Sequence, residues 1–222
     1  MTRETWERAK AEIGNELFTL GPYFAFQALH NPRHFLFTLA RYKFAARMLP
    51  LDRHVHVLEL GCGEGLGTLL LADGGHRVMG VDFDGEAISH ARESIRNPDI
   101  EFVCKDFIGQ VLGSFHAVVS LDVIEHIPQA QEDLFVRTVC DNLTAEGFAV
   151  IGTPNESAKQ YASRASEIGH VNLFTGQRLA SLMGKYFTNV FAFGMNDEMV
   201  HTGFLPMSHY LIVLCCGKIT KE

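Results

Sequence analysis

The sequence lacks the features that mark secreted, zinc-binding and membrane-spanning proteins. Its five cysteines include no CxxC pair, and an odd set that stands mostly in apolar surroundings indicates reduced thiols. Residues 1–10 are charged and contain no apolar run of the kind found in a signal peptide. The longest late apolar stretch, Tyr210–Cys216, is far shorter than the roughly 20 residues of a transmembrane helix. These absences predict a cytoplasmic protein without a membrane span.

A basic surplus is also absent, because 19 lysines and arginines stand against 26 acidic residues. The net charge of −7 disfavours a long nucleic acid or an anionic membrane as the partner and leaves a small molecule as the expected one. Hydrophobic residues make up 47% and charged residues 20% of the 222 residues, as in soluble globular proteins. A chain of this length is expected to form one domain, whose oligomeric state the sequence leaves open.

From residue 55 onward, short apolar runs alternate with helical segments. This alternation predicts an α/β fold with a mostly parallel sheet of seven strands and crossover helices. The predicted strands are Val55–Leu60, Arg77–Val81, Ile100–Cys104, Ala117–Leu121, Phe148–Gly152, Val190–Gly194 and Tyr210–Cys215. The predicted helices are Gly65–Ala72, Glu86–Ile95, Gln131–Leu143 and Thr175–Tyr186.

Residues 1–50 differ from the rest in being helical in character, rich in phenylalanine and interrupted at Gly21-Pro22 and Asn31-Pro32. Two interpretations stay open for this segment. Its helices pack on the main domain, or they form a cap over the substrate side. We therefore expect an N-terminal helical extension or cap over residues 1–50 and one main domain over residues 51–222.

The first predicted strand leads into a glycine-rich loop, ELGCGEGLG, at residues 59–67. The dinucleotide pattern GxGxxG fails in every register, because the sixth residue is Leu66, Thr68 or Leu70. An NAD-dependent oxidoreductase is thereby disfavoured. The acid before the glycines, Glu59, suits a cationic ligand better than a pyrophosphate.

This loop and three later segments resemble, in order, the motifs of the class I, Rossmann-like S-adenosylmethionine methyltransferases. The segments are GVDFD (80–84), VCKDF (103–107) and VVSLD (118–122). The resemblance implies a Rossmann-like sheet with helices on both faces and S-adenosylmethionine as the cofactor. It implies that Asp82 holds the ribose hydroxyls, Phe83 lies against the adenine and Asp106 accepts from the adenine amino group. The cofactor-binding residues expected on this basis are Glu59, Gly61, Cys62, Gly63, Gly67, Asp82, Phe83, Asp106, Phe107 and Ser120.

A candidate metal site follows the fourth predicted strand in DVIEHIP (122–128). In a helical turn, Asp122, Glu125 and His126 would share one face, and His170 adds a second imidazole. The pattern resembles the ExxEH-type O-methyltransferases, among them the ubiquinone-pathway enzymes and those that methylate the terminal 2′-hydroxyl of small RNAs. Asp122 departs from their glutamate. Binding of Mg²⁺, Mn²⁺ or Zn²⁺ and a metal-free role for these residues both stay open.

The chemistry implied is methyl transfer to oxygen. Glu125, His126 and His170 are the candidate catalytic residues, because a metal or a histidine base activates a hydroxyl at neutral pH. The acceptor expected is a small molecule: a sugar, a sugar-linked intermediate or a phenol-like compound. Two alternatives remain, namely an RNA 3′-terminal ribose 2′-O-methyltransferase and a non-catalytic methyltransferase-like partner subunit.

Overall fold

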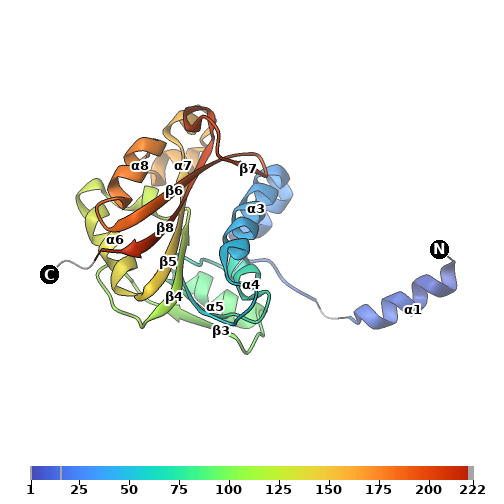
Figure 1. The fold of residues 1–222 in the computed structure, drawn as a ribbon. Helices are drawn as coiled ribbons and strands as arrows, with labels where there is room; N and C mark the ends of the chain where they lie inside the picture. Colours follow the sequence, from blue (N-terminus) through green and yellow to red (C-terminus); the bar gives the residue numbers. More distant parts are fainter. Residues whose placement is uncertain (1, 16, 220–222) are drawn as a thin grey trace.

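The computed structural model describes residues 2–15 and 17–219. Within these residues, eight strands form one sheet in the order β3-β2-β1-β4-β5-β8-β6-β7, with helices on both faces (Figure 1). Neighbours from β3 to β5 pair parallel, whereas β8 and β6 join antiparallel. The strands are β1 His56–Leu60, β2 Arg77–Asp82, β3 Ile100–Cys104, β4 Phe115–Leu121, β5 Leu143–Pro154, β6 Phe187–Asn196, β7 Met199–His201 and β8 Tyr210–Lys218.

The predicted α/β fold is confirmed, and each of the seven predicted strands is found. The eighth strand, β7, is a three-residue return that pairs with the end of β6. The turn between them contains Asp197 with φ 52°. A strand of three residues is too short to show the alternation that reveals strands in a sequence.

Eight α-helices and four short 3₁₀ turns connect the strands in the described part of the chain. Both proline interruptions in the N-terminal segment are helix starts, since Pro22 and Pro32 occupy first-turn positions where no backbone N–H is needed. The helices are α1 Arg3–Ile13, α2 Pro22–His30, α3 Pro32–Met48, α4 Leu66–Ala72, α5 Gly85–Ser94, α6 Glu132–Asp141, α7 Arg164–Gly169 and α8 Gly176–Met183; the 3₁₀ turns are η1 Ile124–His126, η2 Gln129–Gln131, η3 Glu156–Tyr161 and η4 Leu205–Met207.

Alternate residues of β1 contribute to the two larger of the three apolar clusters formed by the described residues. Leu58 and Leu60 of β1 pack with α6 and α8 on one face, while Val57 packs with α3 and α4 on the other. Side chains alternate across a strand, so a buried parallel strand needs apolar residues on both faces. The bond from Arg41 of α3 to Asp122 places this helix beside the carboxyl end of β4.

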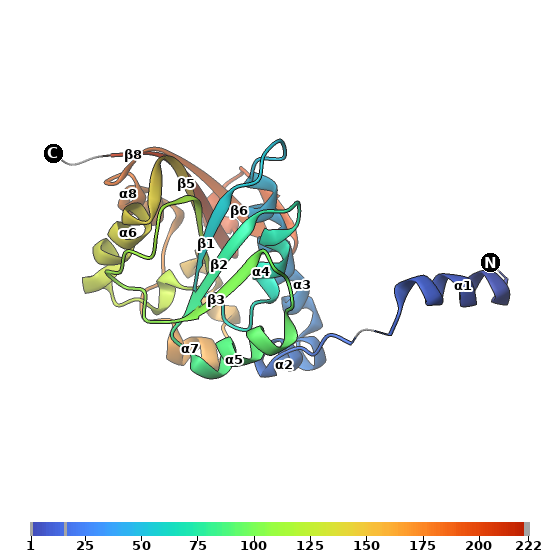
Figure 2. The ribbon, with the colours of Figure 1, turned by 90° about the horizontal axis from the view of Figure 1, so that it is seen from below.

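The N-terminal helix α1 stands away from the body in both ribbon views (Figures 1 and 2). None of its residues is buried, whereas Phe24 of α2 and Arg41 and Tyr42 of α3 are. The helical character expected for residues 1–50 is confirmed. Among residues 2–15 and 17–219, none of the helices combines the length and apolar character that a membrane crossing requires.

Candidate active site

The glycine-rich loop between β1 and α4 adopts backbone angles that suit glycine. Gly61 has φ 81°, Gly63 51° and Gly65 79°, a region that other residues rarely enter. A Cβ atom on Gly63 would meet nothing within 4 Å, so this part of the loop faces open space. A Cβ atom on Gly61 would lie 2.3 Å from Cγ2 of Val123. Gly63 therefore leaves the loop open to a ligand, whereas Gly61 allows Val123 to approach the backbone closely.

Four of the expected cofactor residues make contacts inside the protein. A Cβ atom on Gly67 would lie 2.1 Å from the ring of Tyr42, so this glycine lets α3 pack against α4. The side chains of Cys62 and Phe107 are buried in apolar clusters. The hydroxyl of Ser120 donates to the carbonyl of Leu60 at 2.9 Å. The structure thus gives these four positions packing contacts, and their roles toward a cofactor stay predictions.

Asp82, Phe83 and Asp106 lie at the carboxyl ends of β2 and β3, which are neighbours in the sheet. Oδ2 of Asp82 accepts from the backbone N–H of Gly63 at 2.9 Å, so the acid is tied to the glycine-rich loop. Phe83 is 75% exposed, which leaves its ring free to stack on a ligand. Oδ1 of Asp106 accepts from the N–H of Ile108 at 3.1 Å. Loop, acid and ring therefore occupy the edge where α/β sheets bind ligands.

Glu59 is buried at the end of β1, with 1% of its surface exposed. Its Oε2 accepts from the hydroxyl of Thr68 at 2.6 Å, a partner that the sequence analysis did not single out. Its Oε1 has no hydrogen-bond partner among the described residues. Burial, opposed in part by the bond from Thr68, raises the pKa of Glu59 to about 7. A cation beside Oε1 would supply the missing partner and favour the charged carboxylate.

Glu125, His126 and His170 come together beside this edge, with ligand atoms within 4.8 Å of one another. The two imidazole rings are 5.0 Å apart, and Nδ1 of His126 faces the carbonyl of Gly169 at 2.9 Å. Glu125 is fully buried and accepts from the hydroxyl of Thr153 through Oε2, whereas no described residue is a hydrogen-bond partner of its Oε1. Burial and then the charge of Asp122 raise the pKa of Glu125 to about 8. Burial also lowers the pKa of His170.

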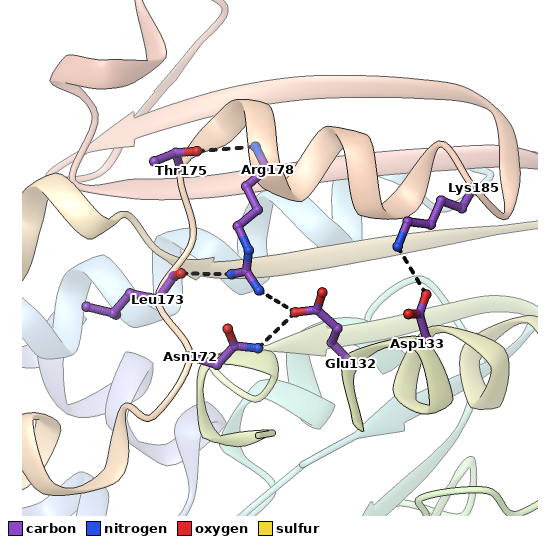
Figure 3. A network of polar contacts seen from close by, with 7 residues as sticks. All are labelled: Glu132, Asp133, Asn172, Leu173, Thr175, Arg178 and Lys185. Carbon is purple, nitrogen blue, oxygen red and sulfur yellow. Dashed lines mark hydrogen bonds and ion pairs between the residues drawn. The ribbon is translucent and has the colours of Figure 1, made fainter. Parts of the chain in front are cut away.

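The segment that carries His170 is fastened to η1 and α6. The backbone N–H groups of Val171 and Asn172 both donate to the carbonyl of Glu125, at 2.9 and 3.0 Å. Figure 3 shows Arg178 reaching from α8 to the carboxylate of Glu132 and to the carbonyl of Leu173. His170 is therefore held against Glu125 by contacts that begin with the next residue, Val171.

Asp122 does not join this group in the described structure. The segment after β4 forms a 3₁₀ turn only from Ile124 to His126, and Asp122 precedes it with φ 58°. Nη1 of Arg41 donates to both carboxylate oxygens of Asp122, at 2.9 and 2.8 Å. The expected face of Asp122, Glu125 and His126 is thus replaced by a group of three, and Asp122 faces α3 instead.

The N-terminal segment is joined to the site at two points that the sequence analysis missed. Arg41 of α3 is 8% exposed, and its guanidinium carbon lies 3.9 Å from the ring centre of Tyr210. Glu64, inside the glycine-rich loop, accepts from the N–H groups of Tyr23 and Phe24 at 2.6 and 3.0 Å. A carboxylate at a helix N-terminus satisfies free donors and suits the helix dipole. Helices α2 and α3 are therefore each attached to the edge that carries the site.

Comparison with known proteins shows what part of this chain is similar to them. Residues 57–147 match the methyltransferase domain model. A probable S-adenosylmethionine-dependent methyltransferase of Mycobacterium tuberculosis is 37% identical over 112 residues, which cover 49% of this chain and 39% of that protein. A ubiquinone biosynthesis O-methyltransferase of Agrobacterium fabrum is 33% identical over 112 residues, covering 49% of this chain and 44% of that protein. The aligned region thus spans less than half the length of either relative.

Solved structures extend the likeness to nearly the whole chain. A TehB-like methyltransferase from Corynebacterium glutamicum superposes with a TM-score of 0.63 at 20% identity, covering 97% of this chain and 96% of that one. An N-methyltransferase from Bradyrhizobium japonicum gives a TM-score of 0.60 at 17% identity, covering 96% and 98%. At such identities the likeness concerns the fold. Residues 57–147 are therefore similar to the methyltransferase domain, and the fold of nearly the whole chain is similar to that of a solved S-adenosylmethionine-dependent methyltransferase.

Proposed function

We propose that this protein transfers the methyl group of S-adenosylmethionine to a hydroxyl group of a small molecule. One observation carries the proposal: the open glycine-rich loop tied to Asp82 lies on the same sheet edge as the group Glu125, His126 and His170. The first part suits a nucleoside, and the second suits an acceptor whose proton must be removed. The name of the Agrobacterium relative, an O-methyltransferase, also favours oxygen.

On this proposal, the cofactor lies along the edge formed by β1, β2 and β3. Asp82 accepts from the ribose hydroxyls, the exposed ring of Phe83 stacks on the adenine, and Asp106 accepts from the adenine amino group. Glu59, with its unpaired buried oxygen, balances the positive charge of the methionine part. The division into a cap over residues 1–50 and a catalytic domain over residues 51–222 belongs to the same proposal.

The reaction needs a base and an aligned nucleophile. The acceptor oxygen forms a bond to the methyl carbon while the carbon–sulfur bond breaks, and its electron pair stays on sulfur. The proton of the hydroxyl passes to a histidine, either His126 or His170. Burial keeps His170 neutral near pH 7 because it lowers the pKa of this imidazole.

The same three residues fit a divalent cation. Two imidazoles and one carboxylate are a donor set found with Zn²⁺, Mn²⁺ and Fe²⁺, and Oε1 of Glu125 is buried without a partner among the described residues. A bound cation would supply acidity to a coordinated hydroxyl. Without a cation, the same residues still bind and orient the acceptor, and a histidine accepts its proton.

Isothermal titration calorimetry with S-adenosylmethionine tests the cofactor assignment. We expect micromolar binding by the wild type and a loss of at least about 30-fold in Asp82→Ala, since hydrogen bonds to a charged group contribute roughly 1.5–3 kcal/mol each. Asp99→Ala, at the opposite end of β3, is the matched control and should bind normally. Absence of binding by the wild type would refute the proposal and favour a non-catalytic partner subunit.

Thermal unfolding tests whether Glu125, His126 and His170 bind a metal ion. Thermal unfolding is measured in EDTA and with Mg²⁺, Mn²⁺ or Zn²⁺, for the wild type and for His170→Asn. A metal-dependent rise in melting temperature that the variant lacks would support a cation at this group. An identical response of both proteins would leave His126 and His170 as metal-free bases.

A further inference from the structure

In the Arg41–Asp122 pair, the side chain of Asp122 is partly accessible, whereas that of Arg41 is buried. The side chain of Arg41 is 9% exposed and that of Asp122 is 32% exposed. Nη1 of the guanidinium is occupied by both carboxylate oxygens, and one face of the group lies on Tyr210. A molecule that approaches from the open side therefore meets the carboxylate first, while the positive charge behind it is already compensated.

Asp122 stands between the N-terminal helices and the candidate catalytic group. It precedes by two residues the 3₁₀ turn Ile124–His126, which carries Glu125 and His126, and it is bound to Arg41 of α3. Burial first, and the charge of Asp122 second, raise the pKa of Tyr23 on α2 and of Glu125, and the same charge acts on His170. Groups from three separate segments thus lie within electrostatic reach of one carboxylate. An acceptor bound beside Glu125, His126 and His170 lies within the field of Asp122.

Helices α2 and α3 each contribute one buried polar atom that has no hydrogen-bond partner among the described residues. Nε of Arg41 is a donor without a partner, and Oε1 of Gln27 is an acceptor without a partner, among the described residues. A buried polar atom without a hydrogen bond costs about 1–3 kcal/mol, which a bound ligand can recover. A hydroxyl group is both donor and acceptor, so it satisfies either atom without bringing a charge.

We propose that the Arg41–Asp122 pair makes the acceptor site selective for uncharged, hydroxyl-bearing molecules over their carboxylate analogues. The inference rests on the proposed function, since it assigns the acceptor class of the same site. An anionic acceptor would meet the partly exposed carboxylate of Asp122, and the charge of the guanidinium that would have attracted it is already compensated by that carboxylate. A neutral acceptor meets no such repulsion.

Two matched probe pairs test this selectivity: catechol against 3,4-dihydroxybenzoate, and methyl glucoside against methyl glucuronide. Binding to the full chain is followed by ligand-observed NMR in EDTA, with and without S-adenosylhomocysteine. We expect the neutral member of at least one pair to bind at least about tenfold more tightly than its anionic analogue. Preference for the carboxylate analogues, or failure of both neutral probes to bind, would overturn the proposal.

The sharper test is a reversal of selectivity in Asp122→Asn. Asparagine keeps the side-chain shape and tolerates the positive φ of this position, but it frees the guanidinium of Arg41 to pair with a carboxylate. We expect the variant to prefer the anionic probe by at least about tenfold. An unchanged preference for the neutral probe would contradict the role assigned to the pair.

Two controls separate this result from misfolding and from failure of the proposed function. The double variant Arg41→Gln with Asp122→Asn carries neither charge and should lose the preference for the anion. The single variant Arg41→Gln keeps the exposed carboxylate and should reject anions at least as strongly as the wild type. Affinity for S-adenosylhomocysteine is measured for each: loss of cofactor binding with intact probe selectivity refutes the cofactor assignment alone.

Discussion

The edge of the sheet carries two groups of side chains that are assembled differently. On the side of β1, β2 and β3, the glycine-rich loop and Asp82 lie within 24 residues of one another along the chain, from Glu59 to Asp82. On the side of β4 and β5, Arg41 meets Asp122 across 81 residues, and Thr153 meets Glu125 across 28. The cofactor side is thus built from local motifs, whereas the acceptor side depends on distant segments.

This difference matches where sequence similarity falls. The methyltransferase domain model covers residues 57–147, which include the glycine-rich loop and Glu125 but neither Arg41 nor His170. The solved structures share the whole fold at 20% identity or less. We infer that the segments outside the matched region adapt the domain to its own acceptor.

The largest effect is expected at Gly61, on the cofactor side. Gly61→Ala combines a positive φ with a Cβ atom 2.3 Å from Val123, so it should lower the free energy of unfolding by about 3 kcal/mol. Gly63→Ala, which meets no atom within 4 Å, is the matched control, with a loss of about 1 kcal/mol. Urea denaturation measures both. Equal losses would mean that the loop moves freely past Val123.

Glu59 should make stability depend on pH. Burial raises its folded pKa to about 7, above the usual 4.5, so the unfolded chain loses the proton first. Its favourable contribution is full below about pH 4, declines as the pH rises toward 7, and is absent above it. The shift corresponds to about 3 kcal/mol.

The substitution Glu59→Gln removes this dependence. Relative to the wild type, the variant should gain about 3 kcal/mol in urea denaturation between pH 4 and pH 8. Glu125, whose pKa is also raised, is present in both proteins. Its effect on the pH dependence of stability is therefore the same in both and cancels in the difference. A constant difference between variant and wild type across this range would show that Glu59 titrates normally.

Breaking the Arg41–Asp122 pair should disturb the side of β4 and β5 without disturbing the side of β1, β2 and β3. Arg41→Met removes the partner of Asp122 and should lower the free energy of unfolding by about 2 kcal/mol, because Asp122 retains access to water. Hydrogen exchange should rise in α2 and α3 but stay unchanged in β1 and β2. Faster exchange in all four elements would mean that the cofactor side is not self-contained.

The smallest effects are expected in the network of Figure 3. Arg178 and Glu132 have side chains 31% and 13% exposed, and Arg178→Met should cost about 1–2 kcal/mol and weaken any metal bound at His170. Lys185 and Asp133 are 55% and 48% exposed, so Lys185→Met should cost less than about 0.5 kcal/mol. Thermal unfolding with and without Mn²⁺ measures both. Equal losses would mean that Arg178 does not position the loop.

Most of the fold was predictable because its signals are local. Apolar runs of strand length and the positions of proline and glycine indicated each long strand and each long helix. The order of Glu59, Asp82 and Asp106 along the chain predicted that these acids would share one edge, since parallel strands end at the same edge. The three-residue β7 escaped prediction because it is too short to show a period.

The sequence by itself determined the α/β fold, the parallel part of the sheet from β3 to β5 and the joint appearance of Glu125, His126 and His170 as candidates. Only the tertiary structure decided that Asp122 leaves this group for Arg41, and that Glu64 holds the start of α2. Spacing along the chain describes contacts within a helix or between successive strands. Pairs that lie tens of residues apart depend on how α2 and α3 pack against the sheet, and no local pattern contains that information.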